Sequence, residues 1–599
     1  LVGYIVEEKL KQDVEEIPGD KHSLQFYLVV DGGFADYSIA EDELESEESA
    51  LAPEDEYLLC VKCGSIQKRD LLGNKCNCGK DYTIQLIKAK STSDEVHKCP
   101  KCGTSNSLFS VVRRLVLGDE SATSVLTTSL YRHSQEMEME VVPVLDDDWD
   151  TYTEVPSPLR STRRLLAFSD SRQDAAFFST YLSDSYSQIL RRRLIVDVLS
   201  ANYQRIVKDG WSINDLAECV MTYVDQLGFF SQEKSRTERK KQCWYWILYE
   251  FLARSGRNSL EGLGIVGYSF RIPDQWKPPK RLREMGLSDQ EITDIYRELL
   301  DSFRIYGAIE FPEGVRPTDE FFEPRNYHYS FKLCGKKHYA NSWLPSRDYL
   351  SNRRLDYLAK IFLKLGIQNH ESEARNLLRK IWESDLFKDP PSAWRGVFVD
   401  SIENAVGTVH RAKYEYWELA MGIGDNPNAF YRCPKCGKLT LRCVHDTCPS
   451  YKCDGKLKKI NPQEEMKDNH YRNLYMSIEP KLMEVAEHTA QLTSQNAAEK
   501  QDRFYRGEIN VLSCSTTFEL GIDVGQLETI LMRNMPPTPA NYIQRAGRAG
   551  RRSDSTAFSL TYAKRRSHDL FYFKDPTKMV SGVIKPPKFE IKKIGRAPV

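Results

Sequence analysis

The sequence predicts an α/β protein in which a parallel-sheet lobe is interrupted by a largely helical insertion and joined to two cysteine-rich modules. Three observations predict this. Apolar runs such as LLAF (165–168) and VLSCS (511–515) are followed by polar turns, as expected of strands buried on both faces. More than 300 residues separate these two runs. Eleven of the fifteen cysteines lie in two dense clusters with CxxC or CxC spacing.

Composition excludes several classes of protein. The chain has 599 residues, 41% hydrophobic and 28% charged, which is ordinary for a globular protein of about three to five domains. The longest apolar runs are far too short to span a membrane, and no signal-peptide pattern begins the chain. A net charge of −1 gives no information about nucleic-acid binding, so any basic surface must be local. Because the chain begins at Leu1, we expect it to be part of a larger protein.

Composition shifts divide the chain into seven parts. We expect a lead-in with an acidic linker (1–55), a cysteine-rich zinc module with a linker (56–160), and the first part of the sheet lobe (161–200). A helical insertion (201–425) and a second zinc module (426–470) follow. The lobe resumes over 471–575, and an extension (576–599) ends the chain.

The first cysteine cluster predicts zinc, but the pairing of its thiols stays open. CVKCG (60–64), CNCG (76–79) and CPKCG (99–103) each place a glycine after the second cysteine, where the backbone must turn so that amides face the thiolates. One tetrahedral site can use Cys60, Cys63, Cys76 and Cys78, or the first two with Cys99 and Cys102. Two sites are also compatible with the six thiols if His97 takes part. This clustering favours zinc in a reducing, cytoplasmic compartment over disulfides.

The second cluster holds five thiols, one more than a tetrahedral site takes. We expect Cys433, Cys436, Cys448 and Cys453 to be the ligands, because KCDG (452–455) repeats the turn-forming glycine. Cys443 is then the spare thiol. A structural role is expected, in which the metal holds a loop-rich region together.

Residues 511–552 carry the clearest functional pattern. VLSCS (511–515) and LETILMRN (527–534) read as strands around the turn FELGIDV (518–524). PANYIQRAGRAGRR (539–552) reads as a helix start followed by glycines and four closely spaced arginines. A solvated helix gains nothing from interior glycines, which cost ~1 kcal/mol each against alanine. The alternative is a basic surface loop, which the strand–turn–strand–helix frame disfavours.

This stretch resembles motifs V and VI of superfamily 2 helicases, in the second of their two RecA-like lobes. QRAGRAGR (544–551) is close to motif VI, and SCSTTFELGID (513–523) is close to motif V. The resemblance implies that Arg548 and Arg551 reach ATP phosphates across a cleft and that Gln544 orders the γ-phosphate region. It places Gly521 and Asp523 on the nucleotide side. It also implies that nucleic-acid phosphates contact the residues Ser515, Thr517 and His488.

RRLLAFSDSRQDAAFFSTYL (163–182) forms a strand–turn–helix unit, with Ser169 or Asp170 available as helix cap. It resembles motif IV of the same helicases, whose loop contacts nucleic-acid phosphates, and Arg172 is the matching cation. The segment 481–515 reads as helix, loop, helix and strand. The resemblance covers 163–182 and 480–587, and the last part is similar to large bacterial helicases with cysteine clusters, of antiphage-defence or DNA-repair type.

The sequence of the insertion supports fewer predictions. Residues 286–312 read as a capped helix, a second helix and a strand, which is compatible with a winged helix. Aromatic side chains between Phe321 and Trp343 can form either a stacking surface for single strands or a small core. Arg191, Arg192 and Arg193 are more typical of a solvated helix face than of a binding patch.

The expected function is that of an ATP-dependent DNA helicase or translocase, with ATP, Mg²⁺ and Zn²⁺ as cofactors. A P-loop is absent from the sequence, and Asp94–His97 (DEVH) lacks the preceding strand that a magnesium-binding box needs. We therefore expect an upstream RecA-like lobe to supply both and to hold most of the Mg²⁺, and this chain alone to be inactive as an ATPase. DNA is the expected partner, with further defence-system subunits and no membrane. Alternatives are a double-strand translocase that does not unwind, and a zinc-rich scaffold with a relict motor lobe.

Overall fold

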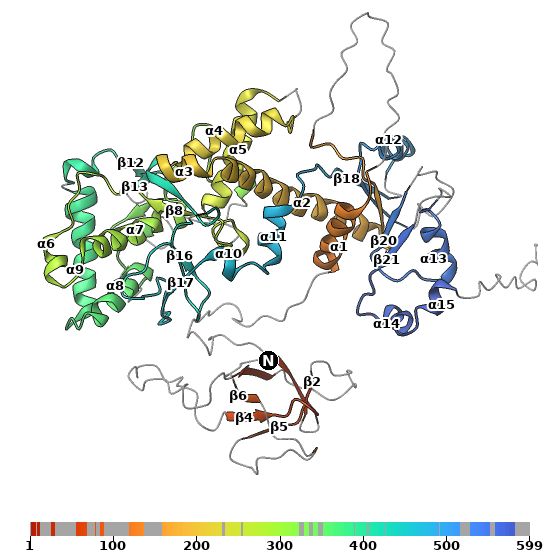
Figure 1. Ribbon diagram of the computed structural model, residues 1–599, viewed down its shortest axis with the longest axis horizontal. Coiled ribbons are helices and arrows are strands. Elements are labelled where there is room, and N and C mark those ends of the chain that lie inside the picture. The colour runs from red at the N-terminus through yellow and green to blue at the C-terminus, as the bar shows by residue number, and fades with distance from the viewer. Residues whose placement is uncertain are drawn as a thin grey trace, which may run out of the picture. The chain divides into compact units, whose positions relative to one another are not determined.

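The computed structural model describes residues 2–6, 9–11, 25–29, 56–68, 78, 84–88, 119–136, 158–230, 234–252, 256–322, 329–334, 340–345, 351–388, 390–403, 407–425, 427–489, 492–515, 527–550 and 557–581. The chain divides into two compact units, and Figure 1 draws the elements of both. The motor lobe comprises Val116–Ile206, Asn214–Ile247 and Lys467–Val599. The cysteine unit comprises Leu1–Leu115, Val207–Ile213 and Leu248–Met466.

The motor lobe is built on a five-stranded parallel sheet in the order β18-β19-β7-β20-β21. These strands span Val485–His488, Val511–Cys514, Leu165–Phe168, Thr529–Met532 and Phe558–Thr561 respectively. The central strand β7 therefore lies between strands that follow it by more than 300 residues, and every residue of β19, β7 and β20 is buried. This confirms the expected RecA-like α/β lobe with an interruption.

Helices of the motor lobe flank this sheet and extend from it. They are α1 (Asp119–His133), α2 (Arg172–Ala201), α3 (Tyr203–Asp209), α4 (Ile213–Gln226), α5 (Arg236–Phe251), α11 (His470–Ser477), α12 (Ser494–Tyr505), α13 (Pro539–Ala546), α14 (Ser567–Lys574) and α15 (Thr577–Val580). The motor lobe takes the start of α3 as far as Ile206, α4 from Asn214 onward, and α5 as far as Ile247. One side of the sheet has a core of Leu166, Phe168, Leu512, Ile530 and Met532.

Helix α1 belongs to the motor lobe, whereas we expected residues 56–160 to form a zinc module with a linker. Its Tyr131 hydroxyl donates to the Leu482 carbonyl at 2.7 Å, and its ring meets Tyr186 of α2 edge-on. The buried side carries Thr123 and Thr127, and the Thr127 hydroxyl bonds the Thr123 carbonyl at 2.6 Å. Threonine and serine are poor helix formers, so this segment gives little helical signal in sequence.

Two local expectations about secondary structure were wrong. The segment before α12 contains the strand β18 rather than a helix, because parallel pairing with β19 overrides the weak local preference. The cap of α2 is Ser171, whose side chain accepts from the Asp174 amide, and not Ser169 or Asp170.

The arginines of α2 also differ from the expected solvated face. Arg192 is buried, and its guanidinium donates to the Tyr475 hydroxyl at 2.8 Å. Arg193 donates to the Tyr475 and Met476 carbonyls at 3.2 and 2.7 Å, near the end of α11. These side chains therefore join α2 to α11, where a cation near a helix C-terminus is favoured.

The cysteine unit begins with a six-stranded sheet in the order β2-β1-β3-β6-β4-β5, all of whose pairings are antiparallel. Its strands in chain order are β1 (Val2–Val6), β2 (Lys9–Lys11), β3 (Gln25–Val29), β4 (Glu56–Leu59), β5 (Ile66–Lys68) and β6 (Ile84–Lys88). A small core of Tyr27, Leu59, Ile66 and Leu86 lies on this sheet. The first CxxC motif occupies the turn between β4 and β5.

The rest of the cysteine unit is the insertion, which mixes helices with three small sheets. Its α-helices are α6 (Lys280–Glu284), α7 (Asp289–Ile305), α8 (Arg353–Lys364), α9 (His370–Lys380) and α10 (Pro462–Glu465), and η6 (Ile381–Phe387) continues α9 as a π-helix. One-turn 3₁₀ helices are η4 (Gly256–Asn258), η5 (Glu320–Phe322), η7 (Ser392–Trp394) and η8 (Tyr414–Tyr416).

The strands of the insertion are short. One sheet joins β9 (Ile309–Glu310), β10 (Phe331–Lys332), β11 (Asn341–Ser342), β12 (Phe398–Glu403) and β13 (Gly407–Lys413). A second pairs β8 (Val266–Phe270) with β14 (Trp417–Met421). The third, in the order β16-β15-β17, contains β15 (Phe430–Arg432), β16 (Leu439–Thr440) and β17 (Lys458–Ile460).

Residues 286–312 contain one long helix, α7, rather than the two that we expected. Ser288 and Glu291 form a capping box at its start. The helix is followed by β9, the pair α8 and α9, and the hairpin β12–β13, and β9 pairs with β13 in parallel. A winged-helix role stays a prediction. Among the described aromatic side chains of residues 321–343, Phe322, Phe331 and Trp343 are buried, and the last two pack against Phe303, as a core does.

Among the described residues, no helix is both long and apolar enough to cross a membrane.

Candidate functional site

The candidate site of the motor lobe lies where its parallel strands end. Ligands of open parallel sheets bind outside the carboxyl ends of the strands. Here Ser169 and Asp170 follow β7, Ser515 follows β19, and Arg533 follows β20. The residues assigned to motifs IV and V therefore share one edge of the sheet with the start of the segment that leads into α13.

Arg172 is exposed at the first position of α2, directly after the Ser171 cap. The start of a 30-residue helix presents free amides and the positive end of the helix dipole. A phosphate oxygen is favoured at such a place, and an exposed arginine adds a permanent cation. This geometry is compatible with the predicted phosphate contact.

Asp170 ties the β7–α2 loop to the helix that carries the motif VI residues. Its Oδ1 accepts from the fully buried Arg545 of α13 at 2.6 Å, and its Oδ2 accepts from the Asn534 amide. Its backbone N–H donates to Asn534 Oδ1 at 3.3 Å. Arg545 also lies over the Phe168 ring. The ion pair thus links a residue two positions before Arg172 to one three positions before Arg548.

Arg533 forms a second buried junction at this edge. Its guanidinium donates to the Ser169 hydroxyl and the Asp174 carbonyl at 2.8 and 2.9 Å, and stacks on the Phe178 ring at 3.8 Å. It also lies 3.6 Å from Glu120 of α1. A buried cation needs such compensation. Neither Arg533 nor Asp170 gave a sequence signal as a site residue, because each sits within a strand-plus-turn pattern that reads as ordinary structure.

Helix α13 has the start that its sequence predicts. Thr538 caps it by accepting from the Asn541 amide, and Pro539 stands in the first turn. Gln544 is exposed, whereas Arg548, just past the helix, is only 9% exposed in this lobe. Gly550 has φ +77°, and a Cβ there would meet Ala557 Cβ at 2.8 Å. The motif glycine therefore fits a close approach that alanine would disturb.

His488 and Ser515 are buried in the motor lobe. The Gln501 amide nitrogen lies 2.8 Å from His488 Nε2 and donates to it when the ring is neutral. Burial lowers the pKa of His488, which favours that neutral form. A nucleic-acid contact by either residue stays a prediction. Thr517, Gly521, Asp523 and Arg551 lie outside the described residues, so their placement is not tested.

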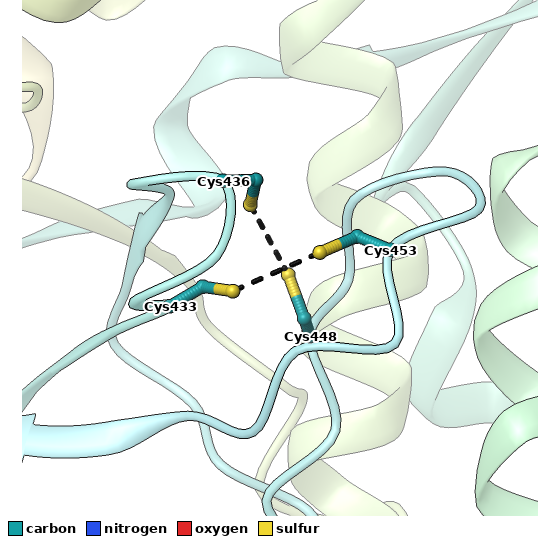
Figure 2. A group of neighbouring side chains, drawn as sticks. All are labelled: Cys433, Cys436, Cys448 and Cys453. Carbon is teal, nitrogen blue, oxygen red and sulfur yellow. Dashed lines mark hydrogen bonds between the residues drawn. The ribbon is translucent and has the colours of Figure 1, made fainter. Parts of the chain in front are cut away.

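The second cysteine cluster brings four thiols together. Figure 2 shows Cys433, Cys436, Cys448 and Cys453 pointing toward one centre. The Sγ atoms of Cys433 and Cys453 are 3.7 Å apart, and those of Cys436 and Cys448 are 3.6 Å apart. Zinc–sulfur bonds of about 2.3 Å put the thiolates of a tetrahedron about 3.8 Å apart, so the residues fit a zinc ion. Cys443 stays outside this group, and its Sγ faces Asp446.

The backbone of this site turns tightly around the four thiols. Gly437 has φ +74° and donates to the Cys433 carbonyl at 2.8 Å, while the Cys433 amide bonds the Lys438 carbonyl. A Cβ on Gly455 would lie 2.4 Å from Cys433 Sγ. The hydrogen bond from Cys448 lowers the pKa of Cys436 to about 4, so thiolate character is available to a cation. Burial raises the pKa of Cys453 to about 11, and that thiol must lose its proton when a metal binds.

The first cysteine cluster repeats this geometry with three described thiols, Cys60, Cys63 and Cys78. Cys60 Sγ lies 3.6 Å from Cys78 Sγ. Gly64 has φ +75° and donates to the Cys60 carbonyl at 2.9 Å, as Gly437 does in the second cluster. Cys76, Cys99 and Cys102 lie outside the described residues, so the fourth ligand stays undecided.

Helix α8 holds the second metal loop through a residue that the sequence did not single out. The Lys360 ammonium donates to the carbonyls of Cys448, Ser450 and Cys453 at 2.9, 3.0 and 2.9 Å. The same ammonium lies 2.9 Å from Asp356 Oδ2. Three carbonyls converge on one cation, and this fixes the backbone that carries two of the thiols.

Arginines join the same loop to α7. Arg442, just before Cys443, pairs with Glu298 of α7 at 3.0 Å, and both are buried. Arg353 of α8 pairs with Glu298 at 2.8 Å and donates to the Pro449 carbonyl at 3.0 Å. The metal loop is therefore part of the framework around α7 and α8, which agrees with a structural role.

Comparison with known proteins finds similarity to helicases. The family model "Helicase conserved C-terminal domain" matches residues 463–553. Druantia protein DruE of Escherichia coli is 36% identical over 173 residues, which are 26% of this chain and 9% of that protein. The ATP-dependent helicase Lhr-Core of Sulfolobus acidocaldarius is 36% identical over 66 residues, 11% of this chain and 8% of its own. The chain thus spans about a tenth of the length of these relatives.

Among solved structures, the DUF1998 helicase MrfA bound to DNA and AMPPNP is similar at 24% identity. The match covers 16% of this chain and 13% of that one, with a TM-score of 0.15, so nothing is inferred from it.

The parallel sheet and the arginine-rich segment after it define a RecA-like motor lobe. With the family match across α11–α13 and the motif VI segment, the chain carries the C-terminal lobe of a superfamily 2 helicase.

Proposed function

We propose that this chain is the arginine-finger half of an ATP-dependent DNA helicase or translocase. The observation that carries the proposal is the Asp170–Arg545 ion pair at 2.6 Å. The pair holds α13, which leads into Arg548, against the loop that precedes Arg172. The residue proposed to contact nucleotide and the residue proposed to contact nucleic acid are therefore anchored at the same edge of the sheet. A relict lobe has no need of this arrangement.

In this proposal ATP and Mg²⁺ bind to an upstream RecA-like lobe that supplies the P-loop, and the cleft closes on the lobe described here. Arg548 and Arg551 then approach the phosphates, where planar, permanent cations stabilise charge on the transferring oxygens. Gln544 is exposed on α13 and faces solvent, available to the γ-phosphate region. Gly521 and Asp523 are assigned to the nucleotide side by motif position alone.

Closure would shift the strand contacts assigned to Arg172, Ser515, Thr517 and His488. His488 and Ser515 are buried, so in this lobe they are better suited to positioning the edge than to touching phosphate directly. Hydrolysis then reopens the cleft, and the strand contacts re-form at a new position along one strand. Contacts of this kind are salt-dependent and largely independent of sequence.

The two cysteine modules are proposed as structural zinc sites, in a reducing cytoplasm. The resemblance to large bacterial helicases with cysteine clusters suggests a role in antiphage defence, beside other defence subunits, with DNA repair as the alternative. A double-strand translocase that does not unwind uses the same motifs. A strand-displacement assay beside a triplex-displacement assay separates these two motors.

The test is Arg548→Ala in the full-length protein. ATPase activity is expected to fall at least about 10³-fold, as for other arginine fingers, while affinity for DNA changes little. The control is Arg506→Ala, an exposed arginine of the same lobe that pairs with Asp502. Normal ATPase activity in Arg548→Ala would remove the arginine-finger assignment. The isolated 599-residue chain is expected to hydrolyse no ATP, and measurable turnover would contradict the two-lobe proposal.

A further inference from the structure

Helix α14 exposes large apolar side chains to solvent. Leu570, Phe571 and Phe573 are 44%, 56% and 67% exposed, although the helix has only eight residues. Exposed aromatic rings this close together are unusual on a surface that no partner covers. At ~100° per residue, Phe571 and Phe573 point about 160° apart and Leu570 and Lys574 project between them, so the four exposed side chains span almost half of the helix circumference. We call this face the α14 platform.

Cations surround the α14 platform. Residues 564–581 contain five lysines and arginines against two aspartates, and one of these, Asp569, is buried. The exposed charges are those of Arg565, Arg566, Lys574 and Lys578, and Asp575 is half-buried. The Lys578 ammonium lies 5.2 Å from the centre of the Phe571 ring. Aromatic rings set among cations suit a polyanion that also offers flat apolar surfaces.

The α14 platform is fixed at the same edge of the sheet as Arg172. The buried Asp569 carboxylate accepts from the Met535 amide at 3.0 Å and the Lys564 amide at 2.9 Å. Met535 follows Asn534, the partner of Asp170. Lys564 comes after β21, and its ammonium lies 3.8 Å from Asp174 in the first turn of α2. Two independent connections therefore place the start of α14 near the start of α2.

We propose that the α14 platform is a second contact for single-stranded nucleic acid, continuing the strand path from Arg172. Phe571 and Phe573 stack on bases, and Arg566, Lys574 and Lys578 bind the phosphates between them. The inference rests on the proposed function, because it extends the strand grip of that motor. Stacking of this kind is tolerant of sequence, as a translocating protein requires.

The test uses the purified 599-residue chain and a fluorescein-labelled 15-mer of deoxythymidine. Phe571→Ala and Phe573→Ala are each expected to weaken binding about fivefold or more, with an unchanged dependence on salt. Arg566→Gln is expected to lower the salt slope by about 0.7, the value for one phosphate contact on a single strand. Replacing all bases of the 15-mer by abasic sites should weaken binding by the wild-type chain, and much less by the Phe571→Ala/Phe573→Ala double variant.

The matched control is Phe558→Ala. Phe558 is 52% exposed in the same lobe but starts β21, at the opposite edge of the sheet, so its loss should leave binding unchanged. Because all three phenylalanines are exposed, the melting temperature should stay within a few degrees of the wild-type value, which separates binding from folding.

Each outcome decides a different statement. If Arg172→Ala weakens binding and the two phenylalanine variants do not, the α14 platform does not bind the single strand, and the proposed function stands. If the wild-type chain binds no 15-mer, the proposed function and the platform both fail. If the double variant keeps its affinity but abolishes ATPase activity in the full-length protein, α14 docks the upstream lobe instead and the inference is overturned.

Discussion

The Asp170–Arg545 ion pair gives the sharpest test of how the motor lobe is held together. Replacing Asp170 by alanine removes the carboxylate that pairs at 2.6 Å with the Arg545 guanidinium, which has no solvent exposure. Breaking a buried pair in this way typically costs ~3–5 kcal/mol. The Asp170 side chain is itself 35% exposed, so water can enter the vacated site and the lower end of that range applies. We therefore expect Asp170→Ala to destabilise the motor lobe by about 3 kcal/mol.

The Asp170→Ala/Arg545→Leu double variant separates the pair from its surroundings. With both charges removed, no buried guanidinium remains, and an apolar side chain can pack on Phe168 in place of the arginine. The double variant should therefore be at least about 1 kcal/mol more stable than Asp170→Ala alone.

Hydrogen exchange measured by mass spectrometry is the suitable assay, because peptides from β7 and β20 report on the motor lobe separately from the cysteine unit. A loss of 3 kcal/mol corresponds to roughly 150-fold faster exchange of the slowest amides. Arg506→Ala, which breaks an exposed pair with Asp502 in the same lobe, should change exchange only slightly. Exchange in Asp170→Ala within about fivefold of wild type would refute the reasoning, as would a double variant that is no more stable than Asp170→Ala.

Three further predictions concern the metal sites and pH. Cys453→Ser should lower the zinc content of the purified chain by one ion per molecule, measured by elemental analysis, whereas Cys443→Ser should not; equal loss in both would contradict the four-thiol site. Lys360→Met should speed zinc transfer to a chelating dye at least about fivefold, since three carbonyl contacts of the metal loop are lost, and an unchanged rate would make Lys360 irrelevant to the site. Burial lowers the pKa of His488 in the folded lobe, so its stabilising effect is present above about pH 6.5 and is lost as pH falls below that value. His488→Gln should make motor-lobe stability less dependent on pH between 7.5 and 5.5. A pH profile identical to that of the wild type would show that His488 does not contribute to the pH dependence of stability.

Much of the motor lobe could be predicted from sequence because its signals are local. LLAF, VLSCS and LETILMRN each contain a continuous apolar run that a strand buried on both faces requires, and the structure has strands there. The four ligand thiols of the second cluster also follow from local spacing and a glycine. In contrast, α1 is held by long-range contacts such as Tyr131 with Leu482, and its own residues favour a helix only weakly.

The residues that hold the site were the least predictable. Asp170, Arg533 and Lys360 are ordinary residues of a turn, a strand end and a helix face until folding brings their partners to them. Arg533 meets Ser169 across 364 residues of sequence, and no periodicity encodes that distance. Spacing within the chain identifies ligands and motifs, whereas these positioning contacts exist only in three dimensions.

Because the motor lobe is interrupted in sequence, its sheet cannot form until the strands after the insertion have been synthesised. The central strand β7 emerges early, but its neighbours β19 and β20 are synthesised more than 340 residues later. At 5–20 residues per second, β7 waits roughly 20–70 s for them. Throughout that interval an apolar strand has neither partner, while the intervening segment can already bring its four thiols together. Production of this chain should therefore depend on chaperones that shield nascent apolar segments.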